Sequence, residues 1–238
     1  MGVVSLGSTS LVDGGKVTQP LSGAATTTCW LGAGVAQVHL MPPAWAAWSS
    51  HTFCPTPMPN VPSVLSSLDL HWQQVDHIER VDAAIDVRPL DDQAQRWHLQ
   101  LEQHFRAVYD RRTQRVDVEV QRADLPQLTL ANVLRFVIAL RLPLEQKGLM
   151  LHASSGGLQH GAVFAGVSTA GKSTLSLGFE RVEYFSDDIS LVTFDDDEVW
   201  LTGAPFFGIY GKRGVQRRIP LRAFCLLDKS EDDVTYVE

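Results

Sequence analysis

The pattern of apolar and polar residues differs between regions of the chain. Between about residues 64 and 120, apolar and polar residues alternate, and a period of two is typical of strands with one buried face. The alternation is clearest at 97–101, 105–109 and 116–120. The polar segments between these stretches are short enough for hairpin turns, so the pattern predicts a small antiparallel meander.

A helical period follows at 128–142. Its apolar residues fall on one stripe, which comprises Leu130, Val133, Leu134, Val137, Ile138 and Leu142. Thr129 is placed to cap this segment and Pro143 to end it, so the pattern predicts a helix that packs on a core. The apolar run 148–153 comes next and contains His152.

Residues 1–62 differ from both regions. They are rich in Gly, Ser, Thr, Ala and Pro, and they carry turn signals such as Gly14-Gly15 and Pro42-Pro43. We expect a mostly irregular or even disordered N-terminal extension here, with a short strand or helix between Trp30 and Trp48. The texture therefore predicts three parts: 1–62, a small β-rich region at 63–125, and a third part at 126–238.

The third part contains G-x-x-x-x-G-K-[ST], the pattern of a phosphate-binding P-loop. It consists of Gly166, Val167, Ser168, Thr169, Ala170, Gly171, Lys172, Ser173 and Thr174. The glycines let the backbone fold back so that successive N–H groups converge on phosphate oxygens. Lys172 would reach the β- and γ-phosphates, and Ser173 would offer its hydroxyl to Mg²⁺. An apolar strand-like run at 161–165 precedes the loop, as this motif requires, so the sequence predicts nucleotide binding.

Composition limits the class of partner and the compartment. The net charge of −7 argues against nucleic acid as the main partner, because a phosphate backbone is bound through excess Lys and Arg. The three cysteines lie far apart and give neither a zinc nor a disulfide pattern, which favours a reducing cytoplasm. Residues 1–16 lack a signal-peptide pattern, and Pro42 and Pro43 interrupt the apolar stretch 30–48. We therefore expect a cytoplasmic protein with no membrane partner.

Two further groups of residues are candidates for chemistry. Ser186, Asp187 and Asp188 follow the short apolar group 182–185. Adjacent carboxylates at a strand end suit a Mg²⁺-nucleotide site, since one can orient the ion and the other can accept a proton from an attacking hydroxyl. A solvated acidic turn is the alternative for this pair, as a satisfied core histidine is for His152. Residues 195–197 are interpreted as a hairpin tip.

A basic cluster near the C-terminal end leaves two interpretations open. It comprises Lys212, Arg213, Arg217 and Arg218. These side chains either contact phosphate or an acidic substrate, or they lie on the exposed face of a hairpin.

Three segments in this order resemble the catalytic core of the HPr serine kinase-like proteins. They are the run around His152, the loop 166–174, and Ser186-Asp187-Asp188-Ile189. The resemblance covers about residues 128–228 and implies a P-loop on a fold related to phosphoenolpyruvate carboxykinase. The expected fold class is therefore α/β, with a nucleotide-binding core of this type preceded by the small β-rich region.

The resemblance also implies an activity and roles for the residues. ATP would donate its γ-phosphate, with Mg²⁺, to a hydroxyl of a protein, peptide or small molecule, with serine as the first expectation. Asp187 would be the general base, oriented by His152, and Lys172 would neutralise developing charge. Ser173 and Asp188 would hold the metal ion, although the residues alone leave the two aspartate roles exchangeable.

Two other classes of function remain as alternatives. A nucleotide-binding regulatory protein would keep the loop without turnover, and an ATPase would hydrolyse ATP without a hydroxyl acceptor. The sequence leaves the acceptor open, and it equally leaves open a homo-oligomer.

Overall fold

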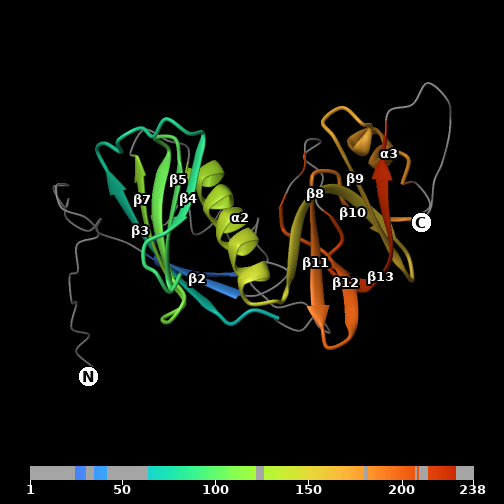
Figure 1. Cartoon of the computed structure of the whole chain (residues 1–238), viewed down its shortest axis with the longest axis horizontal. Helices are drawn as coiled ribbons and strands as arrows, with labels where there is room; N and C mark the ends of the chain where they lie inside the picture. The colour runs from blue at the N-terminus through green and yellow to red at the C-terminus, as the bar shows by residue number, and fades with distance from the viewer. Residues whose placement is uncertain are drawn as a thin grey trace.

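The computed structural model describes residues 25–30, 35–41, 64–121, 126–179, 182–206, 208 and 214–228. Two groups of strands stand on either side of one long helix (Figure 1). We call the strands β1 to β7 together with the helix α2 the N-terminal unit, and β8 to β13 with the short helix α3 the C-terminal unit. Within these residues no helix has the length and apolar character needed to cross a membrane.

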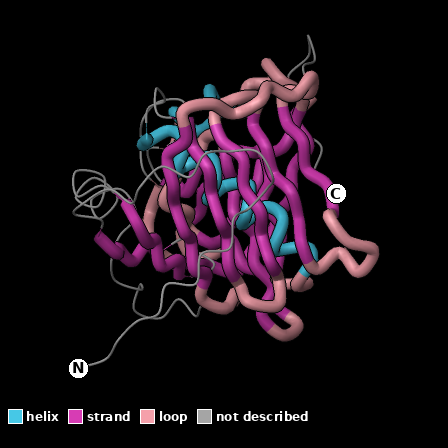
Figure 2. The backbone as a smooth tube through the Cα atoms, turned by 90° about the vertical axis from the view of Figure 1, so that its left-hand side faces the viewer, coloured by secondary structure: helices cyan, strands magenta, loops and turns pink. Residues whose placement is uncertain are grey.

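The N-terminal unit is a seven-stranded mixed sheet. Its spatial order is β1-β2-β3-β7-β6-β5-β4, with β2, β3 and β7 parallel and the other neighbours antiparallel. Seen from the side, the strands lie next to one another in front of the helix (Figure 2). The strands are β1 (Ala25–Trp30), β2 (Val35–Met41), β3 (Leu68–Val75), β4 (Ile85–Pro89), β5 (Arg96–Leu101), β6 (Phe105–Asp110) and β7 (Arg115–Gln121).

The expected meander is confirmed, because β5, β6 and β7 coincide with the three alternating stretches and pair in antiparallel register. β2 lies in the segment 30–48, where a short strand or helix is expected, whereas β1 contradicts the expected irregular extension; both strands belong to the same sheet. Glycine and proline in the flanking segments obscure these short strands. β1 pairs with β2, and β2 pairs with β3, which lies farther along the chain. The rest of 1–62 lies outside the described residues.

Helix α2 (Pro126–Leu144) covers one face of this sheet. The apolar stripe that the sequence predicts is buried as a whole, from Leu130 to Leu142. Pro143 lies inside the last helical turn rather than after it, where its missing N–H costs only one terminal hydrogen bond. The same core includes Leu191 and Phe206 of the C-terminal unit. The predicted boundary at 125 and 126 therefore separates the helix from the sheet on which it packs.

The C-terminal unit closes a ring of strands. β8 pairs with β11 through its first half and with β9 through its second, while β13 pairs first with β12 and then, in parallel, with β9. β10 extends the sheet along β8. The elements are β8 (Gly148–Gly157), β9 (Gly161–Gly166), α3 (Lys172–Leu177), β10 (Glu183–Ser186), β11 (Ile189–Asp195), β12 (Glu198–Thr202) and β13 (Arg218–Leu227). Strands predominate here, so an α/β core of the expected kinase type stays a prediction.

Candidate functional site

The P-loop connects the end of β9 to the start of α3, as its motif requires. Gly171 has a φ of 95°, in the left-handed region that favours glycine, and directly precedes the helix. At Gly166 a Cβ atom would lie 2.6 Å from the carbonyl oxygen of Leu227 on the neighbouring strand. Glycine at this position therefore lets the strand that carries the loop pass close to β13.

Lys172 is buried inside this loop. Its Nζ donates hydrogen bonds to the carbonyl oxygens of Gly166 at 2.9 Å and Val167 at 3.0 Å. Lys172, Ser173 and Thr174 form the first turn of the helix, so their amide N–H groups have no acceptor within it. Helix α3 is only six residues long and is capped by Gly178. The N–H of Gly178 donates to the carbonyl of Leu175, and the N–H of Phe179 donates to the carbonyl of Ser176. The loop N–H groups and the ammonium, rather than a long helix dipole, therefore supply positive potential.

Asp187 and Asp188 form the turn between β10 and β11. The hydroxyl oxygen of Ser186 accepts the N–H groups of Asp188 at 3.1 Å and Ile189 at 2.9 Å, which fixes the turn backbone. Asp187 is 1% exposed, and its Oδ1 accepts the phenol O–H of Tyr184 at 2.5 Å. Gly208 covers this carboxylate so closely that a Cβ there would lie 1.4 Å from Oδ1.

Asp188 turns toward His152 instead. Asp188 Oδ1 lies 3.4 Å from His152 Nε2, and their side chains are 24% and 65% exposed. Residue His152 lies on β8 opposite Ile189, and the next residue, Ala153, donates its N–H to the carbonyl of Asp188 at 2.9 Å. The two carboxylates therefore have different environments, one buried and one open to solvent.

The structure brings the predicted site residues together. Ser173 Oγ donates to the main-chain carbonyl of Asp187 at 3.4 Å, joining the loop to the aspartate turn. Ala153 pairs with Ala165, one residue before the loop begins, so His152 lies at the same end of the ring. Three segments that are separate in the sequence thus meet at one place.

Three residues at this place were missed by the sequence analysis. Tyr184 and Gly208 contact Asp187, and Arg135 of α2 stacks over the Phe206 ring at 5.2 Å. Burial lowers the pKa of Arg135, and the charge of Asp188 opposes that shift. The spacing of Tyr184 three positions before Asp187 was a local signal that the two side chains could meet. No local pattern links Arg135 to Asp188, which lies about fifty positions later.

The described part of the basic cluster is engaged within the C-terminal unit. Arg217 pairs with Glu183 and donates to the carbonyl of Leu158. Arg218 pairs with Asp195 at 2.7 Å and lies 4.1 Å from the Trp200 ring centroid. Lys212 and Arg213 lie outside the described residues. The hairpin tip at 195–197 is confirmed between β11 and β12.

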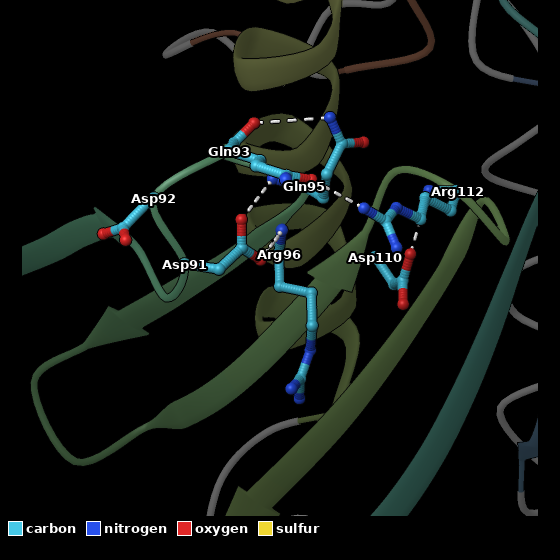
Figure 3. A pocket seen from close by; sticks show the side chains of 7 residues that line it. All are labelled: Asp91, Asp92, Gln93, Gln95, Arg96, Asp110 and Arg112. Carbon is cyan, nitrogen blue, oxygen red and sulfur yellow. Dashed lines mark hydrogen bonds between the residues drawn. The ribbon is translucent and has the colours of Figure 1, made fainter.

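A separate hollow of about 360 Å³ lies in the N-terminal unit, at the turns beside β5 and β6 (Figure 3). Asp91 accepts the N–H groups of Gln95 and Arg96, each at 2.9 Å. These bonds, Gln95 first, lower the pKa of Asp91. Arg112 donates to Gln93 at 2.8 Å. The polar groups here serve the turns, and none of the predicted site residues lines the hollow.

No group of three or more His, Cys, Asp or Glu side chains gathers as a metal site among the described residues. Mg²⁺ beside nucleotide phosphates needs only one or two protein ligands, so this observation leaves the expected ion untested. No protein-family model matches the chain, and no curated protein is significantly similar to it.

Proposed function

We propose that this protein is a cytoplasmic ATP-dependent phosphotransferase of the HPr serine kinase-like type, acting on a hydroxyl group. The observation that carries the proposal is the meeting of the P-loop, the aspartate turn and His152 at one end of the ring. A P-loop by itself indicates nucleotide binding. A carboxylate and an imidazole beside the loop would add the general base that a hydroxyl nucleophile needs.

Lys172 and the loop would bind the nucleotide. The ammonium now bonded to the carbonyls of Gly166 and Val167 would exchange them for β- and γ-phosphate oxygens, while the loop N–H groups surround the phosphates. Ser173 and the neighbouring aspartate turn offer hard oxygen donors, which fit Mg²⁺. The bound ion would neutralise phosphate charge during transfer.

Asp188 is the better candidate for the proton acceptor. Its carboxylate is partly exposed and lies beside His152, so an incoming hydroxyl can reach it. Asp187 is covered by Gly208 and held by Tyr184, and an acceptor cannot touch it in this conformation. The burial thus favours Asp188 over Asp187 as the general base. The oxygen of the acceptor hydroxyl would form a bond to the γ-phosphorus while its proton passes to Asp188. The bond from the γ-phosphorus to the bridging oxygen would break, and ADP would leave with that oxygen.

The test compares variants of the full chain with Mg²⁺, γ-labelled ATP and a host lysate as the source of acceptors. We expect Lys172→Ala to lose nucleotide binding, and Asp188→Asn to keep binding but lose transfer by at least about 100-fold, the scale of general base catalysis. Matched controls are Lys147→Ala and Asp197→Asn, which change exposed turn residues with the same charges.

Each outcome has a definite meaning. Label on an acceptor with wild type and both controls, but not with Asp188→Asn, supports the proposal. Release of inorganic phosphate without any labelled acceptor would identify an ATPase. Tight nucleotide binding with neither transfer nor hydrolysis would contradict the proposal and leave a nucleotide-responsive regulatory protein.

A further inference from the structure

Two hydroxyl groups hold the turn that carries the aspartates. Ser186 Oγ accepts two N–H groups of the turn and so fixes its backbone. Tyr184, two residues earlier on β10, donates its phenol O–H to Oδ1 of Asp187 and so fixes the first side chain of the turn. Both partners of the second bond are buried.

The environment makes this second bond consequential. A buried carboxylate without a donor is costly, because it loses the water that would solvate its charge. Burial raises the pKa of Tyr184 well above its usual range, and the hydrogen bond and charge of Asp187 add to the shift, so the phenol keeps its proton at neutral pH. Tyr184 is therefore a donor to Asp187 whenever the protein is folded near neutrality.

The anchored turn has two outward consequences for the site. The main-chain carbonyl of Asp187 lies at Ser173 of the P-loop, and the side chain of Asp188 points to His152. Because Asp187 and Asp188 are adjacent in a two-residue turn, a shift of the backbone at Asp187 would change the direction of the Asp188 side chain. The bond from Tyr184 to Asp187 and the two bonds to Ser186 together hold the backbone from which the Asp188 side chain extends.

We infer that Tyr184 is a positioning residue of the site, which anchors Asp187 and thereby presents Asp188 beside the P-loop. This role rests on the proposed phosphotransferase function and deepens it. The Tyr184 hydroxyl is bonded to Asp187 rather than to the P-loop, so its loss should lower turnover without weakening nucleotide binding.

Tyr109 provides a matched control. It is also buried, and its phenol lies 3.2 Å from Gln114 Oε1 and 3.4 Å from Glu145 Oε1, but it lies on β6 in the core of the N-terminal unit. Removing either phenol oxygen deletes a donor that a neighbouring side chain accepts. Only Tyr184 should connect that loss to the rate of phosphoryl transfer.

The experiment measures steady-state transfer from Mg·ATP and equilibrium nucleotide binding for Tyr184→Phe and Tyr109→Phe. We expect Tyr184→Phe to lower kcat at least about 10-fold, since small misplacements of a reacting group have large effects on rate, with the KM for ATP within about 2-fold of wild type. Tyr109→Phe should leave kcat unchanged. Equal kcat values for the two variants, or a loss confined to nucleotide binding, would overturn the inference.

A second substitution covers the case in which Tyr184→Phe does not fold. Replacement of Tyr184 by 3-fluorotyrosine keeps the ring and makes the phenol more acidic, and it should alter kcat, whereas the same replacement at Tyr109 should not. An unchanged kcat at position 184 overturns the inference while the proposed function stands. Nucleotide binding by wild type without any phosphoryl transfer overturns both together.

Discussion

The two units of this protein bury different kinds of side chain. In the described residues, the core around α2 has 22 buried hydrophobic residues, and only Leu191, Ala204 and Phe206 of these come from the C-terminal unit. The separate core of that unit has six. Its described interior holds nine buried polar residues, compared with five in the N-terminal unit (His98, Gln100, Glu119, Thr129 and Arg141). The nine are Ser154, Ser155, Lys172, Ser176, Ser186, Asp187, Ser190, Thr193 and Thr202. The N-terminal unit is built for packing, and the C-terminal unit for holding polar groups in fixed places.

This contrast has an energetic meaning. A large apolar core contributes free energy of folding in proportion to its buried area, whereas a buried hydroxyl mainly avoids a penalty when it finds a partner. Ser190 illustrates the second case, because its Oγ donates to the carbonyl of Ala153 and lies 2.7 Å from Ser155 Oγ. Such bonds specify one arrangement of β8, β10 and β11, which carry the candidate site.

Leucine-to-alanine changes in the two cores should give the largest difference in stability. Leu134 and Leu201 are both fully buried, one in each core. We expect Leu134→Ala to lower the free energy of unfolding by about 4 kcal/mol and Leu201→Ala by about 2 kcal/mol, because the smaller core can collapse further around the deletion. Urea denaturation followed by circular dichroism measures both. A larger loss for Leu201→Ala would break the comparison.

The hydroxyl pair of Thr193 and Thr202 sharpens the comparison at a smaller scale. The two Oγ1 atoms lie 2.8 Å apart, and both are buried. Either Thr→Val change alone should lower the free energy of unfolding by about 1–2 kcal/mol, because it leaves the other buried hydroxyl without its hydrogen-bond partner. The double Val variant should have a stability close to that of wild type. Thr113→Val, at an exposed turn, is the control. Additive losses in the double variant would contradict this account.

The smallest expected effect is a pH dependence in the N-terminal unit. Burial lowers the pKa of His98, although Asp86, whose Oδ2 is 3.4 Å from Nε2, opposes the shift. Near pH 6.5 the His98 imidazole of the unfolded chain takes up a proton, whereas burial disfavours this protonation in the folded protein. The contribution of His98 to the free energy of unfolding is therefore complete above that pH and is lost as the pH falls through it. We expect a loss below about 1 kcal/mol between pH 7.5 and 5.5. His98→Gln should flatten this slope and exposed His104→Gln should not.

Local patterns were sufficient for much of the N-terminal unit. The meander and the buried stripe of α2 followed from periods of two and 3.6, because each residue's environment there repeats along its own strand or helix. The strand, loop and helix around Lys172 followed from a motif whose spacing is fixed by phosphate geometry. Gly178 ends α3 because glycine disfavours helix continuation.

Long-range pairing accounts for what the sequence did not predict. β2 lies beside β3, and β13 lies beside β9, through parallel pairings between segments far apart in the chain. The contacts of Gly208 with Asp187 and of Arg135 with Phe206 likewise join residues that are far apart in the sequence. Even the two aspartates could not be told apart from sequence, since their difference arises from Gly208 and Tyr184 on one side and His152 on the other.

The parallel pairing of β9 with β13 has a consequence for synthesis of the chain. The strand that leads into the P-loop acquires its second neighbour only after residues 218–227 have left the ribosome. At about 5–20 residues per second, that neighbour arrives a few seconds after the loop itself. During this interval one edge of β9 is open, so a nascent chain should bind nucleotide late. Stalled chains that end before β13 would report whether the site matures only when the ring closes.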